Sequence, residues 1–320
     1  MLENKQKMSN GVNKPGKKIS IVAACYNESA NIRPFYKRVI ESIKDDYELE
    51  IIYVDNDSQD NSMEIYRKLA AEDSRVKVIF MSRNFGTPQT SYFAGLEYST
   101  GEAVVLIDGD LQDPPEIIPK LVAKWEDGYG VVYGIRKKRQ GRISMRLAYK
   151  LFYRVFKKLA YISIPLDAGE FGLMDRKVIN EIIKFPESEV YIRGLRAYAG
   201  FKQTGVEYTR EVRQAGHSTT SFIRDIGWGK RLIINFSYKP LEWISYVAFI
   251  AFVFALGLGL LNLFLYIANP EQPAGTPTII FAILLLGSVQ LLSLSIIGEY
   301  LSRISLEVKK RPRYIIKEIL

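Results

Sequence analysis

Two long apolar runs near the end of the chain constrain its fold more than any other feature. Between residues 241 and 268 the only polar side chains besides tyrosine and tryptophan are Glu242, Ser245 and Asn262, and residues 278–297 form a second apolar run. A helix of about 20 residues crosses the ~30 Å hydrocarbon core of a bilayer. We therefore expect two transmembrane helices, at residues 241–268 and 277–301, after a large domain.

The distribution of basic residues orients these two helices. The connecting segment, residues 269–277, carries Glu271 but no lysine or arginine, whereas both outer flanks carry several. Lysine and arginine are enriched on the cytoplasmic side of a membrane. We therefore expect a protein of the inner (plasma) membrane with the large domain and both termini in the cytoplasm. Residues 1–18 are predicted to be a disordered tail, 220–240 a juxtamembrane helix and 303–320 a basic cytoplasmic tail.

A basic stretch within the large domain accounts for much of the net charge of +9. Residues 136–158 contain ten basic residues and no acidic one. Basic and apolar residues each recur at every fourth position there, which predicts an amphipathic helix at residues 142–160. With two spans in the same chain, this helix is expected to lie on the anionic lipids of the inner leaflet. The alternative is a solvated basic helix packed on the domain; nucleic acid is not an expected partner.

The large domain, residues 19–219, alternates strand-like and helix-like segments. Strands are predicted at residues 19–24, 49–54, 76–81, 103–107 and 130–135, with helices at 30–44, 60–71, 87–99 and 115–125. Further strands at 170–175 and 204–213 and helices at 176–184 and 191–199 extend the pattern. This order predicts an α/β domain with a Rossmann-like, doubly wound, mostly parallel sheet, which binds ligands at the carboxyl ends of its strands.

Polar residues cluster where four of these strands end. They are, in chain order, Tyr26, Asn27 and Glu28; Asp55, Asn56, Asp57 and Ser58; Arg83 and Asn84; and Asp108, Asp110 and Gln112. Because parallel strands end at one edge of a sheet, we expect these side chains to share a crevice. The sequence has neither a G-x-x-x-x-G-K-[ST] loop nor a G-x-G-x-x-G motif, so neither a P-loop site nor a standard dinucleotide site is indicated.

The segment after the fourth strand offers oxygen ligands for a hard cation. Mg²⁺ and Mn²⁺ prefer carboxylate and carbonyl oxygens together with water and phosphate. An extended backbone would project Asp108, Asp110 and Gln112 to the same side; the alternative is a surface turn, which aspartate and glycine also favour. The single cysteine, Cys25, and the single histidine, His217, argue against an intrachain disulfide and a zinc site built from histidines.

These segments, taken in order, resemble a known enzyme family. The motifs are Ile21-Val22-Ala23-Ala24-Cys25-Tyr26-Asn27-Glu28, Val54-Asp55-Asn56-Asp57-Ser58, Ser82-Arg83-Asn84-Phe85-Gly86, Asp108-Gly109-Asp110-Leu111-Gln112-Asp113-Pro114-Pro115 and Leu166-Asp167-Ala168-Gly169-Glu170-Phe171. They are similar to those of family 2 glycosyltransferases of the GT-A fold. Within that family, the set with its two C-terminal spans looks like the polyprenyl-phosphate glycosyltransferases, which include dolichyl-phosphate mannosyltransferases and bactoprenol glucosyltransferases.

The resemblance implies roles for residues on the donor side. Asp55 and Asp57 match an acidic pair that contacts the nucleoside, although the family's usual Asp-Asp-Gly-Ser reads Asp55-Asn56-Asp57-Ser58 here. Substrate-binding residues are also expected at Tyr26, Glu28, Arg83 and Asn84. Asp108, Asp110 and Gln112 match the motif that binds Mg²⁺ or Mn²⁺ and the donor diphosphate, with Asp110 taken as catalytic.

On the acceptor side, Arg210, Arg213 and Ser218 match a basic loop that receives the acceptor phosphate. This loop departs from the family at Thr219, where a lysine is common, and at Ala215. Asp167 and Glu170 are the candidates if a general base acts, and Asp167 is equally a candidate for holding a loop.

The implied reaction is inverting transfer of a sugar from a nucleotide sugar to a polyisoprenyl phosphate. Our hypothesis is glucose from UDP-glucose to undecaprenyl phosphate, which is largely ionised at neutral pH because its second pKa is about 6. A mannosyl or aminosugar transferase would share every feature, and a non-catalytic membrane scaffold of the same fold is the alternative of a different class. Self-association into a homo-oligomer through the two-helix anchor is also plausible.

Overall fold

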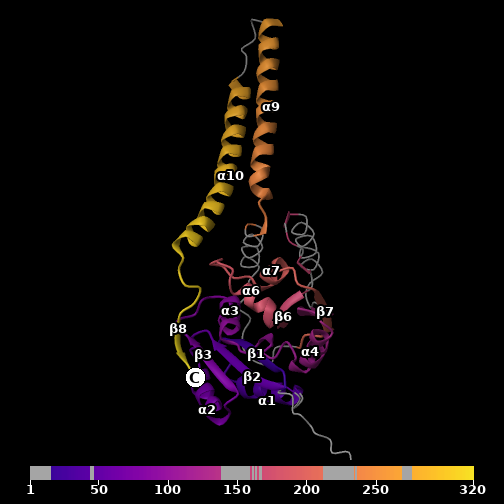
Figure 1. Cartoon of the computed structure of the whole chain (residues 1–320). Coiled ribbons are helices and arrows are strands. Elements are labelled where there is room, and N and C mark those ends of the chain that lie inside the picture. Colours follow the sequence, from indigo (N-terminus) through magenta and orange to yellow (C-terminus); the bar gives the residue numbers. More distant parts are fainter. Residues whose placement is uncertain are drawn as a thin grey trace, which may run out of the picture. The chain divides into compact units, whose positions relative to one another are not determined.

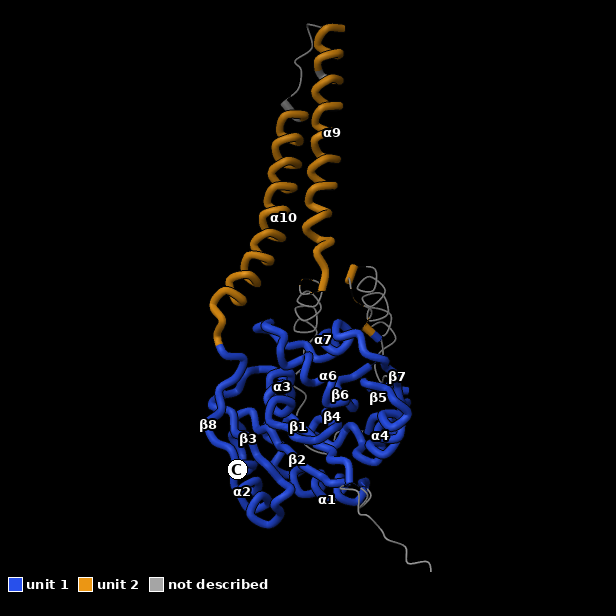
Figure 2. The backbone as a smooth tube through the Cα atoms, in the orientation of Figure 1, with its two compact units in different colours: residues 1–140, 165–218, 312–320 blue, residues 141–164, 219–311 orange. Residues whose placement is uncertain are grey.

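The computed structural model describes residues 16–43, 47–137, 168–211, 236–268 and 276–320, with positions 159, 160, 162, 164, 165 and 234. The chain divides into two compact units (Figure 2). The first comprises residues 1–140, 165–218 and 312–320, and the second comprises residues 141–164 and 219–311. The predicted helices at 142–160 and 220–240 lie almost entirely outside the described residues.

The first unit is built on one eight-stranded sheet (Figure 1). Its strands are β1 (Lys18–Cys25), β2 (Glu48–Asp55), β3 (Val76–Met81), β4 (Ala103–Asp108), β5 (Val131–Arg136), β6 (Ala168–Asp175), β7 (Gln203–Tyr208) and β8 (Ile316–Ile319), in the order β7-β5-β6-β4-β1-β2-β3-β8. Four pairings are parallel, β1 with β2, β1 with β4, β2 with β3 and β5 with β7. The predicted doubly wound α/β sheet is confirmed, with β6 and β8 added in the antiparallel sense.

Helices cover both faces of this sheet. One face carries α1 (Ile32–Ser42), α2 (Ser62–Glu72) and α4 (Ile118–Glu126), which follows the short 3₁₀ helix η1 (Pro115–Ile117); the other carries α3 (Pro88–Tyr98), α6 (Arg176–Ile182) and α7 (Ile192–Tyr198). Alternate residues of a strand face opposite sides, so Ile21 and Ala23 of β1 join the first core while Val22 and Ala24 join the second. Burial on both faces explains why these strands read as continuous apolar runs.

The last strand, β8, comes from the segment that follows the two apolar helices. Its end pairs with β3 through two backbone hydrogen bonds, from Val78 N to Leu320 O (3.1 Å) and from Leu320 N to Val78 O (2.9 Å). Arg67 of α2 binds the carboxylate of Glu318, with 2.9 Å from Nη1 to Oε1. The C-terminal segment is therefore part of the sheet of the first unit, an element that sequence analysis did not anticipate.

The second unit contains the two long apolar helices, α9 (Lys239–Ala268) and α10 (Thr276–Lys309). Both are long and apolar enough to be candidate membrane spans, and their apolar windows are 6% and 0% buried. A core helix of a soluble domain would be mostly covered, so this exposure favours the membrane interpretation. The two helices pack through Phe254 and Phe281, whose ring centroids lie 6.4 Å apart. The Tyr300 hydroxyl of α10 also donates a 2.7 Å hydrogen bond to the carbonyl of Ser237, two residues before α9.

Candidate active site

The strand register brings the ends of the central strands into line at one edge of the sheet. Cys25 of β1 lies opposite Asp55 of β2, and Ala24 of β1 lies opposite Asp108 of β4. The loop after β4 is also tied back to β1, because Gly109 N donates a 3.0 Å hydrogen bond to Ala24 O. The loops that leave β1, β2 and β4 therefore start side by side, as their parallel order requires.

The loops after β1 and β2 are linked through Asn27. Its side-chain oxygen accepts from Gln59 N (2.7 Å), and its own N–H donates to Ser58 Oγ (2.8 Å). The Ser58 hydroxyl in turn donates to Asp55 Oδ1 at 2.5 Å. Asn27 holds this geometry with φ +55°, a left-handed conformation that asparagine tolerates better than most residues. The predicted donor-side residues are thus preorganised by a shared hydrogen-bond network.

The predicted donor-side residues differ in their exposure to solvent. Tyr26 is 38% exposed and offers a ring face, whereas Glu28 is buried and accepts a 2.5 Å hydrogen bond from Asn31 Nδ2. Asp55 is also buried, and burial raises its pKa despite the opposing hydrogen bonds from Ser58. Asp57 has φ +62°, so it adopts the backbone conformation that glycine favours at the corresponding place in Asp-Asp-Gly-Ser.

The loop after β3 is fixed by paired asparagines. Asn56 Nδ2 donates to Asn84 Oδ1 (3.1 Å), and Asn56 Oδ1 accepts from Phe85 N (3.0 Å). Asn84 Oδ1 also accepts from Gly86 N at 2.6 Å. Asn84 is therefore engaged in shaping the loop, while the guanidinium of the neighbouring Arg83 stacks on the Phe85 ring, 4.2 Å from its centroid.

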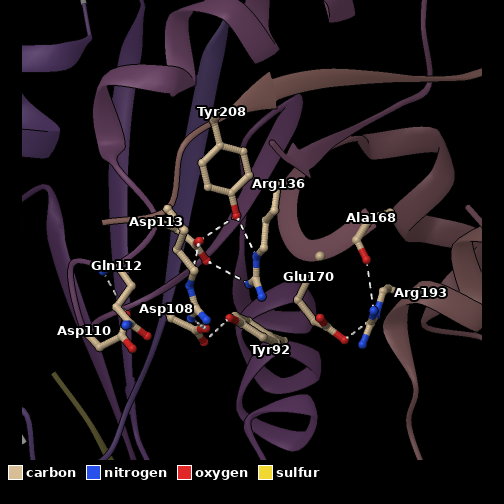
Figure 3. Close-up of polar contacts among 12 residues, drawn as sticks. Tyr92, Asp108, Asp110, Gln112, Asp113, Arg136, Ala168, Glu170, Arg193 and Tyr208 are labelled. Carbon is tan, nitrogen blue, oxygen red and sulfur yellow. Dashed lines mark hydrogen bonds and ion pairs between the residues drawn. The ribbon is translucent and has the colours of Figure 1, made fainter. Parts of the chain in front are cut away.

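The proposed metal motif begins at the last residue of β4. The backbone is not extended beyond Asp108, because β4 ends there and Leu111 has φ +60°. The prediction that an extended backbone projects Asp108, Asp110 and Gln112 to the same side is therefore wrong. A turn places these residues instead, with Gln112 N donating 3.1 Å to Asp110 Oδ1. Figure 3 shows Asp108 and Asp110 as neighbours.

The electrostatics at Asp108 suit a divalent cation. Burial, followed by the like charges of Asp110 and Asp113, raises the pKa of Asp108 to about 7, although 31% of its side chain is exposed. A hydrogen bond from Tyr92 and the charge of Arg210 oppose this shift. Crowded carboxylates of this kind are relieved by a bound cation. Among the described residues no three carboxylate, histidine or cysteine side chains cluster as a metal site. A cation such as Mg²⁺ is commonly held by one or two carboxylates plus substrate phosphates.

A buried ion cluster lies next to this motif. Asp113 is 1% exposed and accepts a 2.6 Å hydrogen bond from the Tyr208 hydroxyl. Arg136 Nη2 lies 3.6 Å from Asp113 Oδ2, and Arg210 Nε lies 3.4 Å from Asp113 Oδ1. Arg210 Nη2 also lies 3.9 Å from Asp108 Oδ2. Of the residues predicted for the acceptor side, Arg210 therefore stands beside the metal motif.

Glu170 occupies a second charged cluster. Its Oε1 accepts from Gln89 Nε2 (2.8 Å) and Arg193 Nε (2.9 Å), and Arg193 Nη1 also donates to the Ala168 carbonyl at 2.9 Å (Figure 3). Burial alone would raise the pKa of Glu170, but the charges of Arg193 and Arg196 and the hydrogen bonds hold it below its ordinary value. These contacts favour a role in holding Arg193, whereas a general base at this position stays a prediction.

Three predicted residues, Asp167, Arg213 and Ser218, lie outside the described residues, as do Ala215, His217 and Thr219. Sequence reasoning gave no role to Tyr92, Asp113, Arg136 and Tyr208, which contact the predicted site. Asp113 belongs to the motif that runs from Asp108 to Pro115. Arg136 and Tyr208 meet because β5 pairs with β7, and Tyr92 reaches Asp108 because α3 packs on the sheet. Neither arrangement carries a local sequence signal.

Comparisons with known proteins show the family of the chain. Residues 20–183 match the family model of glycosyl transferase family 2. The chain is 40% identical over 307 residues to the uncharacterized glycosyltransferase YkcC of Bacillus subtilis, covering 93% of each chain. It is 37% identical over 306 residues to the bactoprenol glucosyl transferase of Shigella phage SfX, covering 94% of this chain and 99% of that one.

Among solved structures, residues 1–349 of S. aureus TarS in complex with UDP-GlcNAc align with a TM-score of 0.47 at 20% identity, over 68% of this chain and 65% of that one. The family match and the near full-length relatives settle the classification. The chain belongs to glycosyl transferase family 2.

Proposed function

We propose that this protein is a membrane-bound inverting glucosyltransferase that moves glucose from UDP-glucose to undecaprenyl phosphate at the cytoplasmic leaflet. The observation that carries the proposal is the 37% identity to a bactoprenol glucosyl transferase over 94% of this chain and 99% of that one. This alignment is long enough to include the two candidate spans as well as the α/β unit. A scaffold without activity would not need the charged site described above.

On the donor side, Asp108 and Asp110 would hold Mg²⁺ or Mn²⁺ together with the diphosphate. A bound cation supplies Lewis-acid stabilisation of the charge that develops on the leaving UDP. Asp57 and the exposed ring of Tyr26 stand on the loops expected to receive the nucleoside. The chain's own contribution is to fix these loops in advance, through the hydrogen bonds of Asn27 and Asn56, so that less ordering is required when the donor binds.

On the acceptor side, Arg210 would bind the lipid phosphate. A phosphate oxygen would attack the anomeric carbon, the bond between that carbon and the diphosphate oxygen would break, and its electron pair would leave with UDP. Because the phosphate is already largely ionised at pH 7, no protein side chain has to remove a proton. The engagement of Glu170 with Arg193 supports a role for Glu170 in holding Arg193.

The membrane placement rests on α9 and α10. Both ends of this helix pair continue into the first unit, since residues 165–218 precede it and residues 312–320 follow it. A hairpin that crosses a bilayer twice returns the chain to the side from which it started. The excess of lysine and arginine outside the hairpin supports the cytoplasmic side for the α/β unit.

The experiment is to incubate the purified full-length protein with undecaprenyl phosphate, Mn²⁺ or Mg²⁺ and a panel of radiolabelled nucleotide sugars. We expect organic-phase label from UDP-glucose, little from UDP-N-acetylglucosamine or GDP-mannose, and loss of product with EDTA. The control is Asp110→Asn, which should abolish transfer while the protein remains folded. Preference for GDP-mannose would show that the transferred sugar is mannose instead of glucose. No product from any donor would favour the scaffold alternative.

A further inference from the structure

Asp113 is the common anion of a cluster assembled from three strand ends. Asp113 lies on the loop after β4, Arg136 is the last residue of β5, and Arg210 follows the end of β7 by two residues. The register of the parallel pair β5 and β7 sets Arg136 opposite Tyr208. A single buried carboxylate thus draws together two arginines that are far apart in the sequence. Figure 3 shows Asp113 with Arg136 and Tyr208.

The Tyr208 hydroxyl fixes the geometry of this cluster. It donates a 2.6 Å hydrogen bond to Asp113 Oδ1 and accepts a 3.1 Å hydrogen bond from Arg136 Nε. The hydroxyl therefore bridges the carboxylate and one guanidinium. Gly134 of β5 leaves room for this ring, since a Cβ there would lie 2.6 Å from Tyr208 Cε1. The glycine in β5 therefore makes space for the ring of Tyr208, which orients Arg136.

Arg210 is held in a different way, and 29% of its side chain is exposed, which leaves it accessible to an anion. Its Nε is buried and, within the part of the chain that the structure describes, has no hydrogen-bond partner; the 3.4 Å approach to Asp113 is an ion pair only. Its Nη2 reaches toward Asp108 at 3.9 Å. Two guanidiniums around one point repel each other unless an anion lies between them, and Asp113 supplies that anion.

We propose that Asp113 is a positioning residue that holds Arg136 and Arg210 beside the metal motif, so that both guanidiniums meet the phosphate of the acceptor. Arginine binds phosphate through paired, directional N–H groups, so a change in its orientation weakens binding even when its charge remains. Asp113 itself touches neither substrate. The identity of the anion as a polyprenyl phosphate rests on the proposed function.

Binding measured without turnover tests this role. Isothermal titration calorimetry on the detergent-solubilised full-length protein would use farnesyl phosphate as a short polyprenyl phosphate, and UDP with Mn²⁺ as the donor-side probe. In Asp113→Asn the neighbouring arginines lose their shared counter-ion, and we expect farnesyl phosphate to bind about tenfold more weakly, with UDP affinity within twofold of wild type. Glu116→Gln is the matched control. Glu116 lies three residues after Asp113, and its carboxylate pairs with Arg38.

A second variant guards against misfolding. Tyr208→Phe keeps all three charges and removes only the bridging hydroxyl, so we expect a smaller loss, of about threefold, again confined to farnesyl phosphate. Equal loss of farnesyl phosphate and UDP in both variants, unchanged binding of both ligands, or no binding of farnesyl phosphate to the wild type would each overturn the proposal. Failure of the proposed function would be seen separately, as absence of sugar transfer by a wild type that still binds farnesyl phosphate.

Discussion

The hydroxyl of Tyr92 in α3 donates a 2.5 Å hydrogen bond to Asp108 Oδ1 at the end of β4. A helix on one face of the sheet therefore orients a carboxylate at its carboxyl edge. Tyr92 is buried, so its hydroxyl has little freedom to point elsewhere. The hydrogen bond stabilises the ionised form of Asp108, the form that a cation requires.

We expect Tyr92→Phe to raise the Mn²⁺ concentration needed for half-maximal transfer by about 10-fold to 100-fold, the usual effect of removing a partner of a metal-binding side chain. Activity at saturating Mn²⁺ should be largely retained. Metal titration of the purified enzyme checks this. Tyr98→Phe, at the exposed end of the same helix, is the control; an unchanged Mn²⁺ requirement in Tyr92→Phe would argue against a metal at Asp108.

Position 109 has no room for a side chain, because Cys25 lies against it. A Cβ at Gly109 would lie 2.4 Å from Cys25 Sγ, so Gly109→Ala should lower stability by about 1–3 kcal/mol and displace Asp108 and Asp110. In the double variant Gly109→Ala with Cys25→Ala, the sulfur is gone and part of the lost stability and activity should return. Chemical unfolding of the three variants measures the coupling, and strictly additive losses would refute the steric explanation.

The pairing of Arg193 with Glu170 gives a prediction with a pH dependence. Arg193→Met leaves a buried carboxylate without its main partner, which should cost about 3–5 kcal/mol at pH 7. In the wild type the pKa of Glu170 is lowered, so its contribution to stability is present above the unfolded pKa of about 4.3 and is lost as the pH falls through the folded value.

In the variant, burial is opposed only by the charge of Arg196 and the hydrogen bond from Gln89, so we expect the pKa of Glu170 to rise and the penalty to shrink as the pH is lowered from 7 towards 5. Urea unfolding at several pH values measures this trend. Adding Glu170→Gln to Arg193→Met should recover much of the loss at pH 7. A penalty that is independent of pH would show that Arg193 acts through its hydrogen bond to Ala168 instead.

Removal of residues 313–320 should destabilise the α/β unit. The deletion strips β8 from β3 and also removes Arg313, whose guanidinium donates 2.8 Å to the Glu187 carbonyl and lies 4.2 Å from the centroid of the Phe93 ring. An open strand edge invites pairing with other chains, so size-exclusion chromatography should show aggregation together with a lower unfolding midpoint.

The matched variant for this deletion is Glu318→Gln, which breaks only the ion pair with Arg67. Those side chains are 35% and 45% exposed, and such pairs contribute about 0–1 kcal/mol. The point variant should therefore behave like the wild type. A truncated protein with an unchanged midpoint would show that β8 adds nothing to the sheet.

The core of the α/β unit could be predicted from sequence because its strands are buried on both faces. β1, β2 and β4 appear as continuous apolar runs followed by polar residues, and the predicted bounds fall within one or two residues of those observed. The resemblance to family 2 glycosyltransferases then pointed to Asp108 and Asp110. These features are local, and local patterns can be read from one segment at a time.

The parts that were missed depend on contacts between distant segments. β8 pairs with β3 across more than two hundred residues of intervening chain, and its four residues carry no turn or alternation signal strong enough to identify a strand. The cluster around Asp113 requires β5 and β7 to be neighbours. Leu111 is buried and has a left-handed conformation, and an isolated Asp-Leu-Gln sequence reveals neither property.

The position of β8 also sets an order of events during synthesis. β3 is translated early, but the strand that covers its edge follows both apolar helices in the chain and leaves the ribosome after them. The nascent sheet must therefore wait, with one edge open, until both apolar helices have been made. Pairing of β8 with β3 is in this way coupled to production of the two apolar helices, and a chain that stops before α10 ends lacks the strand that covers β3.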